Sequence, residues 1–294
     1  MTEPESFLLD RRQLRLAFER AAPSYDAAAV LQREIADRLL ARLDLVRIAP
    51  QAILDAGCGT GYCTRALRRR YRRARLTGLD IAPAMLARAR RRERWFGRSR
   101  WVGGDIESLP FAAGSFDLVL SSLALQWCDP ERAFHELRRV LRPGGLVLFT
   151  SFGPDTLREL RAAWQAVDQV PHVHGFIDMH DLGDALVRAR FADPVMDCER
   201  LVMSYPDVRS LLAELKHLGA HNVARGRRAV LTGKQRFARF QAAYQAAARD
   251  GRIPASFEVV YGHAWGPAAG EDRESRQRAD GTIGVPLSSL RRRP

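Results

Sequence analysis

The sequence has no run of about 18 uncharged apolar residues, so we expect no membrane-spanning helix. Its first residues are acidic and then basic, with no apolar stretch before a cleavage site, which argues against a secretory signal. Cysteine is scarce, and none of the four cysteines forms a C-x-x-C pair, so neither a zinc site nor a disulfide framework is indicated. We therefore expect a reduced, cytoplasmic protein with no metal.

Lysine is nearly absent, because Lys216 and Lys234 are the only two lysines among 47 basic residues. The formal net charge is nevertheless +13, which could indicate a nucleic-acid partner. The arginine-rich runs contain few aromatic residues, so solvated helix faces are the favoured interpretation and a docking surface for an acidic protein is the second. We expect no nucleic-acid ligand, although the charge by itself does not decide the function.

The chain changes its pattern near residue 51. Residues 10–44 show the spacing of helices, with a break at Pro23 and Ser24. Over residues 51–152, short apolar runs alternate with helical patterns at a spacing typical of βαβ units. The pattern predicts an α/β fold with a parallel sheet.

The alternation loosens beyond residue 151. There we expect further helices, two of them at about 206–250, and a last strand over 257–265. Residues 266–294 are largely polar, and we expect a mobile tail. The predicted parts are an N-terminal helical lid (1–44), a main domain with a helical insertion (45–265) and the tail (266–294).

The strongest chemical signal is the segment Asp55–Gly61 (DAGCGTG), which follows an apolar strand and precedes a helix. Its glycines allow a sharp turn and let a ligand approach the main chain, where the N–H groups of the helix start are free. Asp80 ends the next strand, where a carboxylate can accept both ribose hydroxyls of a nucleoside. The dinucleotide fingerprint G-x-G-x-x-G fails, because its third glycine would fall on Tyr62.

The D-x-G-x-G-x-G form instead resembles motif I of class I S-adenosylmethionine methyltransferases. Three later segments resemble the same family and follow in the order that the family shows. They are Gly104–Ile106, Phe116–Leu123 and a turn at Leu141–Gly145. The resemblance implies a Rossmann-like, seven-stranded, mostly parallel sheet with an antiparallel last strand, and S-adenosylmethionine as cofactor. The residues implied for the cofactor are Asp55, Gly57, Cys58, Gly59, Gly61, Asp80, Ile81, Asp105, Ile106, Ser122 and Leu123.

Other segments resemble a narrower family, the malonyl-[acyl-carrier-protein] O-methyltransferases of biotin synthesis. These segments are RLAFERAAPSYD (15–26), SSLALQW (121–127), SFGPDTLREL (151–160), DMHDLGDAL (178–186) and YGHAW (261–265). The similarity runs from about residue 10 to 265. It implies methyl transfer to the free carboxylate of a malonyl thioester. The resulting methyl ester masks the negative charge, so that fatty-acid synthesis can elongate the malonyl unit toward pimeloyl.

Such a carboxylate is already ionised at neutral pH, so the reaction needs alignment and removal of water rather than a general base. We accordingly name no catalytic residue. The candidates for substrate binding are Tyr25, Phe176, His180 and Trp127. Packing is the alternative role for the three aromatic residues, and helix capping for His180. Arg15 and Arg20 flank Phe18 and either hold the carboxylate or face solvent.

Acyl carrier proteins are acidic, so the resemblance also implies an acidic partner that a basic surface would attract. The docking residues that we expect are Arg11, Arg12, Arg225, Arg227 and Arg228. We expect a monomer. Two alternatives stay open: a methyltransferase for another small carboxylic acid or quinone precursor, and a non-catalytic nucleic-acid-binding protein on the same scaffold.

Overall fold

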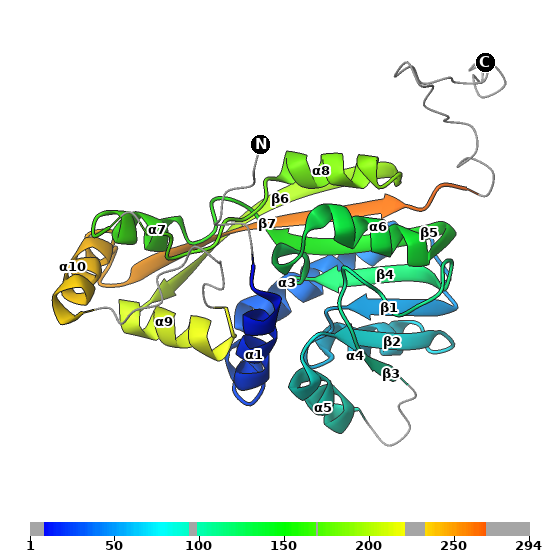
Figure 1. Cartoon of the computed structure of the whole chain (residues 1–294), viewed down its shortest axis with the longest axis horizontal. Coiled ribbons are helices and arrows are strands. Elements are labelled where there is room, and N and C mark those ends of the chain that lie inside the picture. Colours follow the sequence, from blue (N-terminus) through cyan, green and yellow to red (C-terminus); the bar gives the residue numbers. More distant parts are fainter. Residues whose placement is uncertain (1–8, 94–98, 169, 221–232, 269–294) are drawn as a thin grey trace, which may run out of the picture.

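The computed structural model describes residues 9–93, 99–168, 170–220 and 233–268. The strands are β1 (Ala52–Ala56), β2 (Arg75–Asp80), β3 (Arg100–Gly103), β4 (Phe116–Ser122), β5 (Leu141–Phe152), β6 (Ala192–Tyr205) and β7 (Ile253–Trp265). Within the described residues they form one seven-stranded sheet in the order β3-β2-β1-β4-β5-β7-β6 (Figure 1). The first five strands are parallel, and β7 is antiparallel to β5 and β6. The predicted fold class is confirmed.

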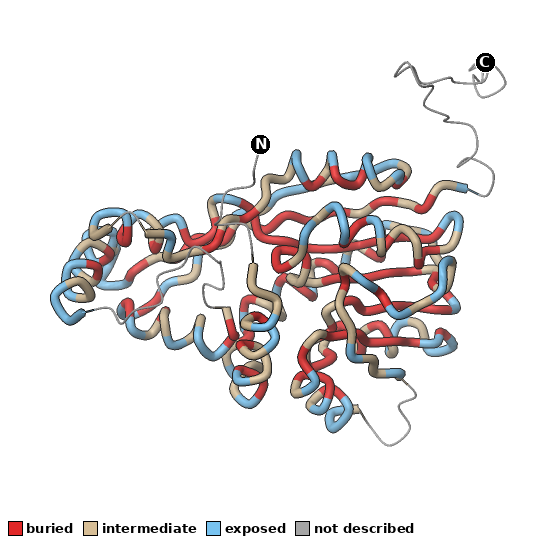
Figure 2. The backbone as a smooth tube through the Cα atoms, in the orientation of Figure 1, coloured by how far each residue is buried: buried red, intermediate tan, exposed pale blue. Residues whose placement is uncertain are grey.

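The central strands are buried because helices cover both faces of the sheet. The covering helices include α3 (Val30–Ala41), α4 (Tyr62–Arg70), α5 (Pro83–Arg92), α6 (Pro130–Val140) and α8 (Met179–Arg188). Every residue of β1 is buried (Figure 2). Ile53 and Leu54, which follow one another in this strand, belong to two separate hydrophobic clusters. A core on each face explains why these strands read as continuous apolar runs.

The arginine-rich runs lie at the ends of helices. Arg68, Arg69 and Arg70 occupy the last turn of α4, and an equivalent run closes α5. Cations there interact favourably with the partial negative charge of a helix C-terminus. Most of these side chains are exposed, which agrees with the interpretation as solvated helix faces.

The N-terminal segment forms α1 (Arg11–Ala21), α2 (Tyr25–Ala28), α3 and a 3-10 turn, η1 (Arg42–Leu45). Asp10 caps α1, because its carboxylate accepts the amide proton of Gln13 at 3.0 Å. The predicted break separates α1 from α2. Whereas α3 packs on α4 and on β4 and β5, α1 packs against α5, beside the carboxyl ends of the parallel strands (Figure 1).

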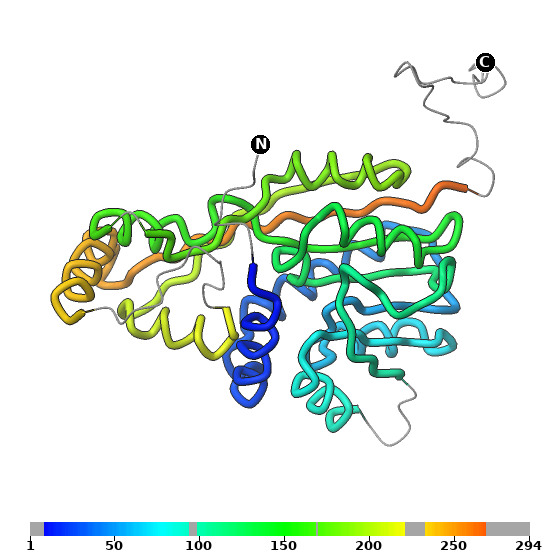
Figure 3. Tube along the Cα trace, in the orientation of Figure 1, coloured from blue at the N-terminus to red at the C-terminus, as the bar shows by residue number. Residues whose placement is uncertain are grey.

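A second group of helices lies beyond the parallel strands, where β6 and β7 extend past them (Figure 1; Figure 3). It consists of α7 (Arg158–Gln165), α9 (Val208–His217) and α10 (Lys234–Gln245). The indole of Trp164 on α7 stacks on Phe240 of α10 at 4.0 Å, and α9 contacts α2 and β6. The helices expected at about 206–250 are therefore present. No helix in the described part of the chain is long and apolar enough to cross a membrane.

One strand boundary differs from the prediction. We expected a turn at Leu141–Gly145 before the strand, but β5 already begins at Leu141, which pairs with Phe116 of β4, and the pairing resumes at Leu146. The pairing register shifts between Phe116 and Leu118, and Gly144 has a φ of +69°. A bulge absorbs the irregular backbone, so the strand continues where the sequence indicated a turn.

Candidate active site

The glycine segment after β1 folds tightly over the end of β2. The amides of Gly57 and Cys58 both donate to the carbonyl of Leu79, at 2.8 and 2.9 Å. Gly57, Gly59 and Gly61 all have positive φ angles, of +76°, +53° and +78°. Glycine adopts this region at no steric cost, whereas other residues do so rarely. The turn that the sequence predicted is therefore formed.

Two buried carboxylates lie beside this turn. Asp80 accepts hydrogen bonds from the amides of Gly59 and Ala82, both at 2.8 Å, and burial raises its pKa to about 6. Asp55 accepts a hydrogen bond from the Thr64 hydroxyl, and burial raises its pKa to about 7. The turn and Asp80 thus fix each other, and the two carboxyl groups lie at the carboxyl ends of β1 and β2.

Two adjoining cavities, of about 610 and 490 Å³ including their open mouths, surround these groups, and we call them together the glycine-loop pocket. They share Tyr25, Gly57, Gly59 and Ser122. The predicted cofactor residues that line the pocket are Asp55, Gly57, Cys58, Gly59, Asp80, Ile81, Asp105, Ile106, Ser122 and Leu123. Gly61 does not line either cavity; it precedes α4, and a Cβ there would lie 2.7 Å from the Trp101 ring.

Helix α1 forms one wall of the glycine-loop pocket through Arg11, Leu14 and Phe18. The Arg11 guanidinium binds both oxygens of Asp105 and donates to the carbonyl of Trp127 at 2.7 Å. The prediction that Arg11 belongs to an outer docking surface was therefore wrong, because this ion pair turns the side chain inward. Arg12, Arg15 and Arg20 on the same helix are exposed, and Arg225, Arg227 and Arg228 lie outside the described residues.

Tyr25 stands at the meeting point of the two cavities. Burial raises the pKa of its phenol, and the nearby carboxylates Asp80 and Asp26 raise it further, so the hydroxyl stays neutral. Asp26 also accepts a hydrogen bond from Thr60 in the glycine turn at 2.6 Å. The start of α2 is thereby tied to the pocket, and a neutral hydroxyl donor is presented to it.

Apart from the glycine-loop pocket, a larger cavity of about 1090 Å³, open mouth included, lies between α3, α7, α9 and the ends of β5 and β7. We call it the aromatic chamber. Trp127 lines both the chamber and the glycine-loop pocket, and its ring meets Phe18 edge-on at 5.6 Å. Phe176 lines the chamber and contacts Phe152. Trp127 therefore stands where a donor in one cavity could meet an acceptor in the other.

His180 is the predicted substrate-binding residue that the structure does not bring to these cavities. Its side chain is 86% exposed, and its Nδ1 lies 2.8 Å from Asp178, which caps α8 by accepting the His180 amide. His180 is exposed because it lies in the first turn of α8, where its side chain stays beside the capping residue Asp178. We accordingly leave His180 out of the site.

Some lining residues were missed from the sequence. Arg11 shares a helix face with Leu14 and Phe18, at the i, i+3, i+7 spacing that could have grouped it with them. His174 and Gln32 line the aromatic chamber, but no regular pattern marks them. Among the described residues, no group of three His, Cys, Asp or Glu side chains is placed to hold a metal ion.

Cofactor binding is expected to weaken as the pH falls. Below a raised pKa the carboxyl holds a proton, and Asp80 then loses its capacity to accept two hydroxyl protons while keeping its bonds to Gly59 and Ala82. We expect the Kd for S-adenosylhomocysteine to rise about tenfold between about pH 7.5 and about pH 5.5, by calorimetry. Asp80→Asn should remove the part of the profile near pH 6 and leave the part that belongs to Asp55. A flat wild-type profile would contradict this assignment.

Comparison with known proteins agrees with this geometry. The methyltransferase domain family matches residues 54–149, from β1 to β5. Among solved structures, the YcgJ protein of Bacillus subtilis superposes with a TM-score of 0.57 at 17% identity, covering 78% of this chain and 97% of that one. A Thermotoga maritima protein described as a SAM-dependent methyltransferase superposes with a TM-score of 0.51 at 18% identity, covering 86% and 99%. These likenesses show the fold.

Curated relatives extend over nearly the whole chain. The malonyl-[acyl-carrier protein] O-methyltransferase of Laribacter hongkongensis is 51% identical over 286 residues, which are 94% of this chain and 95% of the relative. The protein of the same name from Halorhodospira halophila is 49% identical over 290 residues, 97% of each chain. Such identity spans the glycine-loop pocket and the aromatic chamber alike. The chain belongs to the malonyl-[acyl-carrier protein] O-methyltransferase family.

Proposed function

We propose that this protein transfers a methyl group from S-adenosylmethionine to the free carboxylate of a malonyl thioester on an acyl carrier protein. The observation that carries the proposal is the 49–51% identity, over nearly the full length of the chain, to relatives named for this reaction. The two cavities that meet at Trp127 provide a place for each reactant. The product, a malonyl methyl ester, has lost its charge and so suits chain elongation toward the pimeloyl unit of biotin.

The glycine-loop pocket fits the cofactor. Bound there, S-adenosylmethionine supplies an electrophilic methyl group on a positively charged sulfur. Gly59 leaves the main chain open to a ligand, because a Cβ there would meet no atom within 4 Å, and Asp80 offers buried carboxylate oxygens at the end of β2. Asp105 is engaged by Arg11, so we propose that this ion pair orders the adenosine end of the pocket together with Ile81 and Ile106.

The aromatic chamber fits the acceptor. Phe152, Phe176 and Trp164 give it apolar walls, which strip water from a carboxylate and make it more reactive toward a cationic donor. Because the carboxylate is ionised, the residues have only to orient it. We propose that Trp127, at the boundary between the pocket and the chamber, and Tyr25, within the glycine-loop pocket, set that orientation, and that Phe176 walls the malonyl group.

We further propose that the N-terminal helices (residues 1–44) act as a lid on the glycine-loop pocket and that the helices at about 206–250 cap the aromatic chamber. Arg11, Leu14 and Phe18 of α1 already line the one, and Leu212 and Leu215 of α9 line the other. The tail over 266–294 lies almost wholly outside the described residues. Both cavities are built by one chain, so a cytoplasmic monomer is sufficient for the activity that we propose.

The partner that we propose is an acidic carrier. The chain carries a formal charge of +13, and Arg12 and Lys216 are among the exposed cations on α1 and α9. Opposite net charges would accelerate the encounter of enzyme and carrier. Dependence on salt is the expected signature of this attraction, because ions screen exposed charges.

Methyl transfer from labelled S-adenosylmethionine tests the function directly. We expect a base-labile methyl ester on malonyl-acyl carrier protein, weaker labelling of malonyl-coenzyme A, and none on acetyl-acyl carrier protein or free malonate. The KM for the carrier-bound acceptor should rise with salt more steeply than that for the coenzyme A thioester. Labelling of another small acid or a quinone precursor alone would replace the proposed acceptor and leave the cofactor assignment intact.

A further inference from the structure

Two buried polar atoms in the wall of the aromatic chamber, one on His174 and one on Gln32, find no hydrogen-bond partner in the part of the chain that the structure describes. His174 is 6% exposed, and its ring lies between Trp127 and Phe176, with centroid distances of 4.6 and 4.4 Å. Its Nε2 atom is buried and has no hydrogen-bond partner among the described residues. A buried ring nitrogen without a partner is costly, so such a group in a ligand-sized cavity points to a ligand atom.

A second histidine of the same segment shows that the local backbone does not explain the missing partner of His174. His172 also lines the chamber, but its Nε2 lies 2.9 Å from Asp168, and its ring stacks on Trp164 at 3.7 Å. The two side chains thus differ in one respect that matters: His172 has its polar partner within the protein, whereas the Nε2 of His174 has none among the described residues.

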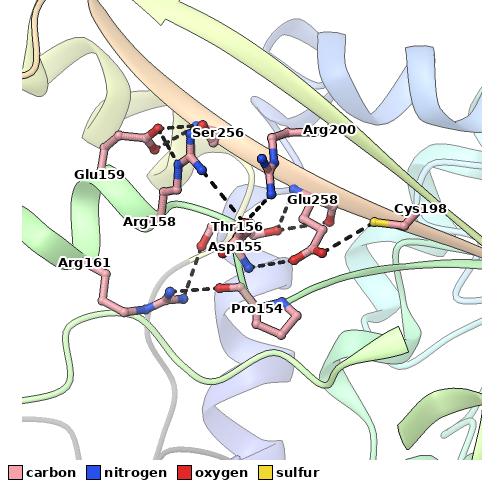
Figure 4. Close-up of polar contacts among 10 residues, drawn as sticks. All are labelled: Pro154, Asp155, Thr156, Arg158, Glu159, Arg161, Cys198, Arg200, Ser256 and Glu258. Atoms are coloured by element: carbon pink, nitrogen blue, oxygen red, sulfur yellow. Dashed lines mark hydrogen bonds and ion pairs between the residues drawn. The ribbon is translucent and has the colours of Figure 1, made fainter. Parts of the chain in front are cut away.

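The surroundings keep the His174 ring neutral. Burial lowers its pKa to about 4, and the positive charge of Arg161 acts in the same direction. Arg161 is held by the carbonyls of Pro154 and Thr156, to which it donates at 2.9 and 3.2 Å (Figure 4). The network around Glu258, which accepts the Asp155 amide at 2.7 Å, fixes that turn in place (Figure 4). Arg161 therefore adds positive potential near the chamber.

A neutral donor suits a carboxylate that is about to be methylated. The reaction joins a cation to an anion, so charge on the carboxylate decreases toward the transition state. A cationic partner would stabilise the starting carboxylate more than the transition state and so oppose the reaction. A neutral N–H fixes the orientation of the carboxylate with less of this penalty, and the apolar walls exclude water.

We propose that the Nε2–H of His174 donates a hydrogen bond to the malonyl carboxylate, on the oxygen that is not methylated, and so selects acyl groups that carry a terminal carboxylate. The contact of His174 with Trp127 places it on the side of the chamber that borders the glycine-loop pocket. Gln32, whose buried Oε1 also has no partner in the described ranges, lines both the chamber and the second cavity of that pocket. The proposal rests on the acceptor proposed above.

A comparison of two ligands on two proteins tests it. Malonyl-pantetheine and acetyl-pantetheine differ by the carboxylate alone, and their Kd values are measured with enzyme saturated with S-adenosylhomocysteine. We expect wild-type protein to prefer malonyl-pantetheine, and His174→Phe to lose about 10- to 100-fold of that preference with the acetyl affinity unchanged. His174→Gln, which retains an N–H donor, should restore most of the preference.

Controls separate this role from a structural one. His172→Phe should lower the thermal midpoint, because it removes the bond to Asp168, yet keep the malonyl-to-acetyl ratio. Should His174→Phe not fold, His174→Leu is measured in the same way. An equal loss for both ligands would overturn the proposal, as would an unchanged ratio. Failure of wild-type protein to bind malonyl-pantetheine or malonyl-acyl carrier protein would instead count against the proposed function itself.

Discussion

Gly57→Ala is expected to lower the free energy of unfolding by about 2–5 kcal/mol and to abolish measurable cofactor binding. Gly57 has a φ of +76°, and a Cβ there would lie 2.3 Å from the Cβ of Ala124. The left-handed backbone costs an alanine about 1–2 kcal/mol and the overlap about 1–3 kcal/mol more. Relief of the overlap requires the glycine turn to move away from the strand ends, which disrupts the pocket. Urea denaturation and calorimetry with S-adenosylhomocysteine measure the two effects.

Gly114→Ala provides the matched control for the backbone alone. Gly114 has a φ of +61°, but an added Cβ would meet no atom within 4 Å, and the residue does not line the glycine-loop pocket. We expect a loss of about 1–2 kcal/mol with unchanged cofactor affinity. If Gly57→Ala proved no more harmful than Gly114→Ala, the close approach to Ala124 would not constrain the turn.

Asp80→Ala is expected to weaken cofactor binding by about 1–3 kcal/mol, or roughly 5- to 150-fold in Kd. The change removes the carboxylate that would accept the ribose hydroxyls. It also frees the amides of Gly59 and Ala82, so the glycine turn loses its anchor. Since the acid is buried and costly to ionise, the free protein should lose less stability than the two lost bonds suggest. Calorimetry at about pH 7.5 gives the affinity.

Asp117→Ala tests whether any strand carboxylate that accepts two backbone amides has this effect. Asp117 accepts the amides of Gln51 and Ala52, both at 2.8 Å, and pairs with Arg142, but it lies at the opposite end of the sheet. We expect reduced stability and unchanged cofactor affinity. Equal losses of affinity in the Asp80 and Asp117 variants would mean that Asp80 supports the fold rather than the cofactor.

The sequence was most informative where local backbone chemistry carries the information. The Asp55–Gly61 turn could be predicted because positive φ angles demand glycine, and the strand before it and the helix after it have distinct periods. The role of Asp80 in cofactor binding could be predicted because this residue lies at the end of the next strand. The resemblance of separated segments identified the family. The relatives bear that out over nearly the full length of the chain.

The tertiary structure decided where individual side chains point. His172, His174 and His180 lie within nine positions of one another, yet their surroundings differ. The first is paired with Asp168, the second is buried with no described partner for its Nε2, and the third is exposed. Arg11 likewise turned inward because Asp105, 94 residues away, lies opposite it. Sequence spacing fixes neighbours along one element, whereas these contacts depend on how distant elements pack. Local sequence patterns therefore determine the glycine turn and the fold class, whereas the aromatic chamber forms only when distant elements pack together.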